Sequence, residues 1–437
     1  MRIRDVFEAD YILLFAALTL EIFGILFIYS SGVTSEGILI STEYLRQIIW
    51  SAAGLIIALV ITLIDYRRIY DLSVYFYLGS IFLLILTLVF GKVINGARWL
   101  RIGSIGIQSS EFTKITTILF LAWYLDSTKR SRKDFTRFLV SCIIVMAPMA
   151  IILMQPDLGT ALVFIPILLG MAFISGISTR YIIFLILFIV FSGVFLVLPI
   201  WQTSIMQNAA PALALFTNKS FIVISCLAFS LIAAIAWFGF IRYHKRYFYW
   251  ICYSAGTLIL SLGTSFAAQR VLKEYQIMRL IVFLDPNVDP KGSGWHIIQS
   301  VTAIGSGGVL GKGYLQGTQS HYRFLPEQST DFIFSILSEE WGFIGGVLVF
   351  ALFLVISLRL IRIMKMTTDL FGSYIIAGLV SMFVFHFLIN VGMTMSIMPI
   401  TGIPLMFMSY GGSAIITAMT GIGLALSIYV RRYMHSL

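Results

Sequence analysis

The chain has 437 residues, of which 59% are hydrophobic and 11% are charged, and its net charge is +10. Soluble domains carry roughly 25% charged residues, so this composition and a mean hydropathy of +0.95 exclude a soluble protein and indicate an all-α polytopic membrane protein. A net charge of this size would suggest nucleic acid in a soluble protein. Here the basic residues lie in short loops between apolar runs, which is a topology signal, and we expect no nucleic-acid partner.

Twelve apolar runs of about 18 to 25 residues are candidates for spanning helices. They lie near residues 11–30, 46–64, 71–91, 112–126, 137–154, 158–176, 181–200, 220–241, 248–267, 341–358, 371–393 and 405–430. The run at 112–126 is the shortest. The first run follows only Arg2 and Arg4 and lacks a small-residue cleavage site, so we expect a retained span instead of a signal peptide.

Threading these spans from a cytoplasmic N-terminus tests the topology. It places 18 of the 30 Lys and Arg residues in short cytoplasmic segments, as the positive-inside rule requires. Both termini are then cytoplasmic, and the stretch 275–331 faces outward. The loop and hairpin at 201–267 add an even number of spans, so we interpret them as an insertion in a single domain, 1–437.

The stretch 275–331 is polar and rich in Gly, unlike the rest of the chain. A loop of this length is usually functional or disordered, and its aromatics and apolar islands argue against disorder. We expect residues 268–340 to form an extracytoplasmic active surface. Within it, Gly305–Gly313 resembles a phosphate loop, but Ser306 and Gly313 break the pattern, which favours a set of turns.

Asp331 follows this stretch, and two roles are open for it. Ser329 or Thr330 could cap a helix whose first turn holds Asp331, where a carboxylate suits the helix dipole. Alternatively, a carboxylate at the membrane surface beside a hydrophobic wall could have a raised pKa and act as a general base. Residues 331–340 are predicted to form an interfacial helix before the next span.

Other polar residues lie at the predicted helix ends. Glu111 and Lys114 are i and i+3 on a helix and can pair, either for function or only to fix packing. In the corner Gln155–Thr160, Asp157 is expected to cap the following helix. Asn390 and the segment Ser409–Ser413 are interpreted as close helix packing. The three Cys residues lie in apolar runs without ligand-like spacing, so we predict neither a disulfide nor a metal site.

Together these segments resemble the SEDS family of bacterial cell-wall polymerases, which includes RodA and FtsW. The resemblance covers nearly the whole chain in order, through RWL, SSEFTK, QPDLGTA, YQIMR, DPNVDPKGSGWHIIQS, AIGSGGVLGKG, GTQS, LPEQSTDFIF, SEEWG, NVGM and GIPLMFMSYGGS. GTQS and the GKG step are closer to the RodA-like elongation members than to the division members.

The resemblance implies a peptidoglycan glycosyltransferase that polymerises lipid II, with inversion, on the outer face of the bacterial cytoplasmic membrane during elongation and shape maintenance. It implies a class B penicillin-binding transpeptidase as partner, beside other membrane proteins of the elongation complex. It assigns Asp331 as the catalytic residue. The substrate-binding residues expected from the resemblance and from charge on the outward side are Arg98, Trp99, Arg101, Glu111, Lys114, Arg279 and Lys312. A divalent cation could share the leaving-group role, although no ligand cluster is visible.

Three departures from the family pattern stand out. Gln108–Glu111 lacks the usual Pro, Ser329 replaces the usual His before Thr-Asp, and the family has ten spans where twelve are expected here. Two rival functions remain open at this point, a lipid II flippase or transporter and a scaffold without catalysis; the division paralogue is a further alternative. Polar residues crowding the outer face, away from the midplane, favour the polymerase.

Overall fold

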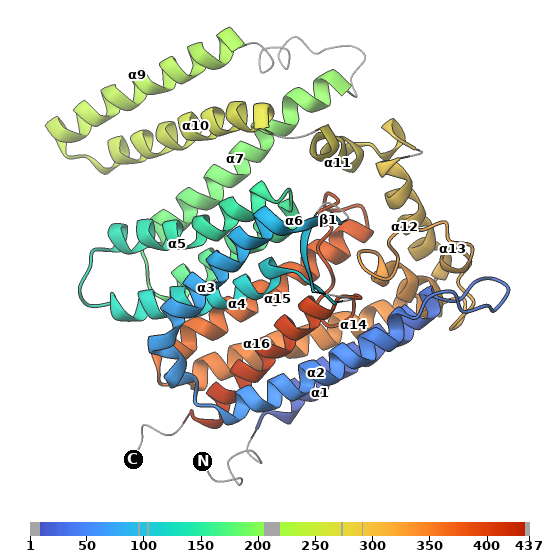
Figure 1. Cartoon of the computed structure of the whole chain (residues 1–437). Coiled ribbons are helices and arrows are strands. Elements are labelled where there is room, and N and C mark those ends of the chain that lie inside the picture. Colours follow the sequence, from blue (N-terminus) through green and yellow to red (C-terminus); the bar gives the residue numbers. More distant parts are fainter. Residues whose placement is uncertain are drawn as a thin grey trace. The chain divides into compact units, whose positions relative to one another are not determined.

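The structure, a computed structural model, describes residues 9–94, 97–102, 105–204, 219–271, 274–290 and 292–432. The chain divides into two compact units, residues 1–177 with 299–437 and residues 178–298, and each is described by itself. The helices of the first unit are α1 (Tyr11–Ser31), α2 (Glu43–Leu63), η2 (Tyr66–Arg68), α3 (Ile69–Phe90), α4 (Ser109–Ser127), α5 (Asp134–Met154), α6 (Leu158–Ile174), α13 (Thr318–His321), α14 (Ile333–Met366), α15 (Leu370–Thr394) and α16 (Gly412–Val430). Figure 1 shows α1 and α2 running along α14 and α16.

The protein is a multi-pass membrane protein. Among the described residues, ten helices are long and apolar enough to cross a membrane. All twelve predicted runs form helices, but the predicted count of twelve spans is not confirmed. Helix α6 has only 17 residues, and α4 carries three ionisable residues along its 19. The last run is also shorter than predicted, because α16 begins at Gly412 and the residues before it form turns.

Helix α15 is the centre of the first unit, packed against α4, α6 and α14. Small residues allow these close approaches, as is common in membrane helices. A Cβ atom at Gly378 of α15 would lie 2.8 Å from the Ile118 side chain of α4. Helices α15 and α16 are largely buried, whereas α2 and α3 expose most of their apolar side chains, as lipid-facing helices do.

At one end of the first unit, three arginines join the ends of neighbouring helices. Arg359 of α14 pairs with Asp10 at the start of α1, with Nη2 and Oδ2 2.6 Å apart. Arg431 donates to the carbonyl of Thr62 at the end of α2, and Arg137 to that of Leu125 at the end of α4. Because the helices alternate in direction, the connections at 32–42, 91–108, 311–332 and 395–411 all lie at the opposite end. The predicted orientation, with both termini on the cytoplasmic side, stays a prediction.

The connection between α3 and α4 is a small antiparallel sheet, which was not predicted from the sequence. Its strands are β1 (Lys92–Ile94), β2 (Ala97–Ile102) and β3 (Ile105–Ile107), in the order β1-β2-β3. Lys92 pairs with Trp99, and Arg101 with Gly106. The sheet fixes the register of Arg98 and Trp99 immediately before α4.

The second unit contains α7 (Thr179–Ser204), α9 (Lys219–Tyr243), α10 (Arg246–Val271), α11 (Glu274–Leu284), η4 (Pro286–Val288) and the start of α12 (Ser293–Gly307). The predicted hairpin is present as α9 and α10 (Figure 1); its origin as an insertion stays a prediction. The predicted loop 275–331 is wrong as a loop, because α11, η4, α12 and α13 lie within it. The many Gly residues of this stretch favoured a loop in the sequence-based prediction. In the structure, α12 nevertheless includes Gly305 and Gly307.

Candidate functional site

The glycine-rich segment after α12 packs by its backbone against a kink in α14. The kink is at Gly342, whose φ of 61° and ψ of −155° belong to a region that only Gly adopts readily. The amides of Lys312 and Gly313 donate to the carbonyls of Glu339 and Glu340, each at 3.0 Å. At Gly311 a Cβ atom would lie 2.0 Å from the backbone carbonyl oxygen of Glu340. The glycines therefore permit contact between two backbones; no phosphate-binding loop is needed to explain them.

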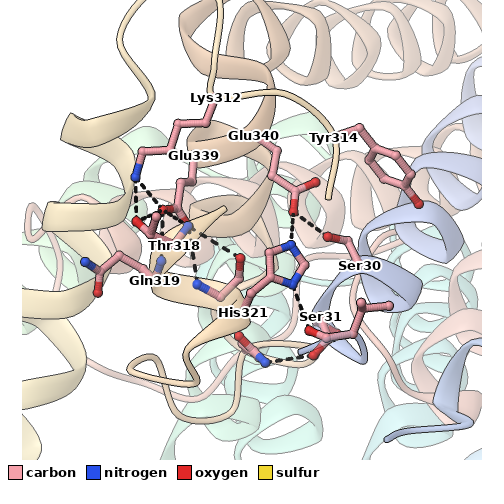
Figure 2. A network of polar contacts seen from close by, with 12 residues as sticks. Ser30, Ser31, Lys312, Tyr314, Thr318, Gln319, His321, Glu339 and Glu340 are labelled. Atoms are coloured by element: carbon pink, nitrogen blue, oxygen red, sulfur yellow. Dashed lines mark hydrogen bonds and ion pairs between the residues drawn. The ribbon is translucent and has the colours of Figure 1, made fainter. Parts of the chain in front are cut away.

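The Glu339 carboxylate, which is fully buried, organises the next segment (Figure 2). It accepts the amide of Thr318 at 2.7 Å, the amide of Gln319 at 2.9 Å and Nζ of Lys312 at 2.8 Å. Hydrogen bonds to a charged acceptor contribute about 1.5 to 3 kcal/mol each. One carboxylate thus fixes the start of α13 and the glycine segment to α14.

The neighbouring carboxylate, Glu340, ties the same segment to α1. It accepts a short hydrogen bond from the Ser30 hydroxyl, and His321 Nε2 lies 3.5 Å from its Oε1. The contact with Glu340 raises the pKa of His321, because a carboxylate favours the protonated imidazole, while burial opposes the shift. Burial is the main cause that raises the pKa of Tyr314 to about 12, and the negative charge of Glu340 adds to the effect. Tyr314 is therefore a neutral donor, and it donates to the Leu26 carbonyl.

Asp331 lies between this anchored segment and the loop after α15. The expected helix cap is wrong: α14 begins at Ile333, and its N-cap, Phe332, makes no side-chain cap. The reason is a tight turn in which the Glu327 carbonyl accepts the amides of Thr330 and Asp331. Asp331 therefore lies ahead of the first helical turn and is only partly buried. The predicted helix 331–340 is present as residues 333–341 before the kink.

Asn390 of α15 joins Asp331 to the loop between α15 and α16. Its Nδ2 donates to the Asp331 carbonyl at 2.9 Å and to the Ile403 carbonyl at 2.8 Å. A Cβ atom at Gly402 would lie 3.5 Å from the Asp331 carboxylate. The sequence predicted only close packing for Asn390. In the structure its side chain also joins the backbone of Asp331 to the loop that follows α15.

The predicted pair on α4 forms directly beneath this loop. Nζ of Lys114 lies 2.8 Å from Oε1 of Glu111, and both side chains are buried. Lys114 also contacts Nε2 of His386 at 3.1 Å, and Nδ1 of His386 faces the Pro404 carbonyl at 3.1 Å. His386 was not among the residues predicted from the sequence. Its only signal was its ionisable side chain within a span, which by itself indicates function.

Gln108, just before α4, joins two further motif segments. Its side-chain Nε2 donates to Asp157 Oδ2 at 3.0 Å, and its backbone N–H donates to the Ser413 hydroxyl at 3.1 Å. Asp157 caps α6 as predicted, accepting the Thr160 amide at 3.0 Å. Residues distant in the sequence thus converge at one end of the first unit.

The remaining predicted substrate residues do not all converge. Arg98 donates to the Leu88 carbonyl at the end of α3, and the Trp99 ring lies against Gly106. The side chain of Arg101 is outside the described residues. Arg279 lies on α11 in the second unit, where burial and then Arg279 lower the pKa of His296. In the parts of the chain that are described, no group of three His, Cys, Asp or Glu could hold a metal ion.

Comparison with known proteins decides the family. Residues 10–209 and 220–434 match the model of the FtsW, RodA and SpoVE family of cell cycle proteins. The chain belongs to this family. It is 50% identical to the peptidoglycan glycosyltransferase RodA of Treponema pallidum, across 99% of this chain and 100% of that one. It is 32% identical to the peptidoglycan glycosyltransferase MrdB of Escherichia coli K12, across 99% and 96%.

A solved structure supports the same assignment. It is titled as structural coordination of polymerization and crosslinking by a peptidoglycan synthase complex. Its chain is 25% identical to this one with a TM-score of 0.68, over 97% of this chain and 98% of that one. The predicted SEDS membership, RodA-like character and enzyme class, a peptidoglycan glycosyltransferase, are confirmed. The roles of individual site residues stay predictions.

Proposed function

We propose that this enzyme polymerises lipid II on the outer face of the cytoplasmic membrane, with Asp331 as general base. The observation that supports this most is the position of Asp331. The residue is only partly buried, while its carbonyl is held by buried Asn390 at the meeting point of three motif segments. A base held by its own backbone needs little reorganisation when the substrate arrives.

The reaction joins two lipid-linked disaccharides. A sugar hydroxyl of one attacks the anomeric carbon of the other, the new C–O bond forms as the bond to the lipid pyrophosphate breaks, and the configuration inverts. Asp331 accepts the hydroxyl proton, which is worth roughly 100 to 10,000-fold in rate. The departing pyrophosphate requires preorganised positive charge.

Arg98 and Arg101 on β2 are our candidates for that charge. Lys114 is fully buried and paired with Glu111, so in this proposal it positions α4 and does not touch the leaving group. Lys312, bound to Glu339, likewise positions the segment before Asp331. Trp99 is proposed to pack on sugar or prenyl surface.

The biological setting is part of the proposal. The identity to RodA of Treponema pallidum supports a role in elongation, and the basic end of the helix bundle supports cytoplasmic termini in the bacterial inner membrane. The synthase-complex relative supports a class B penicillin-binding transpeptidase as partner.

The test uses purified full chain with a cognate transpeptidase whose crosslinking is blocked, and labelled lipid II. Wild type should form glycan polymer, and Asp331→Asn should lose about 100-fold or more. Glu36→Gln, at an exposed loop carboxylate, is the control and should keep wild-type activity. Equal polymer from Asp331→Asn would remove Asp331 as the base; no polymer from wild type would favour a flippase or a scaffold.

A further inference from the structure

A polar cavity of about 610 Å³ is lined by residues that include Ser329, two positions before Asp331, and it is not used in the mechanism above. One wall is formed by Ser31 and by residues 40–46, the end of the α1–α2 connection and the first turn of α2, which carry Glu43 and Arg46. The other is the segment before Asp331, with Arg323, Glu327 and Ser329. Ligand sites usually measure about 300 to 1,000 Å³ and are mostly apolar, so this lining indicates a polar ligand of modest size.

The charges in this cavity point to a ligand with charges of both signs. Arg46 and Arg323 are exposed, and neither guanidinium has an ion-pair partner among the described residues. The Glu43 carboxylate is likewise without an ion pair within the described ranges. Guanidinium groups bind carboxylates in a fixed fork geometry, and carboxylates bind ammonium groups.

The two walls are held together before any ligand binds. Gln328 Nε2 donates to the Ser31 carbonyl at 2.8 Å, and Nδ1 of His321 faces the Val33 carbonyl at 2.7 Å (Figure 2). The Glu339 carboxylate fixes the turn from which the segment of Arg323 emerges. A rigid site loses less entropy on binding, which favours specific recognition.

The position relative to Asp331 decides which part of the substrate could enter. Ser329 precedes Asp331 by two residues, which span at most about 7 Å. A group entering the cavity is therefore attached near the reacting sugars. Peptides that become crosslinked through amide bonds must carry an amine on one chain and a carboxyl end on another, which matches both signs of charge in the lining.

We propose that this cavity binds the peptide attached to the lipid-linked disaccharide, with Arg46 and Arg323 on its carboxylates and Glu43 on its ammonium group. The inference rests on the proposed function, because it assumes that substrate. It makes these three residues determinants of affinity for the peptide-bearing substrate.

The test measures equilibrium binding of two fluorescent lipid-linked disaccharides to the full chain in nanodiscs, one with its peptide and one with the peptide replaced by a simple amide. The variant Arg46→Ala with Arg323→Ala should weaken binding of the first about ten-fold and leave the second unchanged, since exposed ion pairs are individually weak. Arginine-to-lysine changes should restore part of the affinity. The control is Arg130→Ala with Arg132→Ala, two exposed arginines at the opposite end of the first unit.

Three outcomes would overturn the proposal: equal wild-type affinity for both lipids, equal weakening of both in the variant, or weaker binding by the variant of prenyl pyrophosphate without sugar. The last would assign the cavity to the pyrophosphate. Because binding is measured without turnover, a wild-type chain that forms no polymer would refute the proposed function and still leave this result decisive. Where polymer forms, KM for the peptide-bearing substrate should rise about ten-fold with kcat nearly unchanged.

Discussion

Replacing Glu339 by Gln should release the segment that precedes Asp331. In the structure the buried carboxylate accepts the amides of Thr318 and Gln319 and pairs with Lys312. Gln retains the shape of the side chain, but it loses the charge and turns an NH₂ group toward groups that are themselves donors. The fold of the spanning helices should persist, because their packing does not depend on this carboxylate.

The structure sets the size of the effect. Breaking a buried ion pair costs about 3 to 5 kcal/mol. The Lys312 side chain is 27% exposed and the Glu339 side chain 0% exposed, so water can partly solvate the orphaned ammonium. We therefore expect the lower figure, about 3 kcal/mol, which corresponds to roughly a 100-fold larger opening constant for this segment.

Hydrogen exchange with mass spectrometry on the full chain measures that opening directly. The amides of Thr318 and Gln319 should exchange roughly 100-fold faster in Glu339→Gln, whereas amides in α15 and α16 should not change. Glu36→Gln is the matched control, because Glu36 lies exposed in the α1–α2 connection. Adding Lys312→Met to Glu339→Gln should recover part of the protection, as paired residues couple. Exchange within about 3-fold of wild type would show that the carboxylate does not hold the segment.

Two further predictions concern the same region. Because the folded-state pKa of His321 is raised by Glu340, its contribution to stability is complete below the unfolded value of 6.5 and is lost as pH rises through the folded value. After correction for intrinsic rates, amides following α13 should therefore lose protection as pH rises above 6.5, and His321→Gln should flatten that dependence. Gly311 and Gly37 have φ of 80° and 78°, but a Cβ atom meets a carbonyl oxygen only at Gly311. Gly37→Ala should cost about 1 to 2 kcal/mol and Gly311→Ala at least about 1 kcal/mol more in thermal unfolding; equal costs would contradict the close backbone contact.

The sequence predicted the helices well where local physics decides them. A run of about 20 apolar residues can satisfy its backbone in lipid only as a helix, so all the predicted runs appear as helices. Most bounds agree within a few residues, but the run at 341–358 lies within the longer α14, Ile333–Met366, and the run at 405–430 is helical only from Gly412. The pairing of Glu111 with Lys114 and the cap at Asp157 were equally accessible, because both join residues three apart. The sheet at 92–107 was missed because its strands are short and its Gly residues favour a loop.

Parts of the candidate site follow from the sequence and parts do not. Asp331 was identified through resemblance, but its expected place in the first turn of a helix was wrong. The Glu339 and Glu340 carboxylates were visible only as adjacent charges before a span. Nothing local indicated that one would bind α13 and the other α1, because their partners follow from the fold and not from spacing.

The sequence by itself determined the membrane class, the approximate helices, the family resemblance and the local pairs, since hydrophobic runs and short spacings act over a few residues. Only the tertiary structure decided that Lys114 meets His386, 272 residues away, and that Asn390 holds the carbonyl of Asp331, 59 residues away. It also decided that the glycine segment packs on the kink at Gly342. Such contacts form when packed helices bring distant residues together, and they leave no periodic signal in one chain.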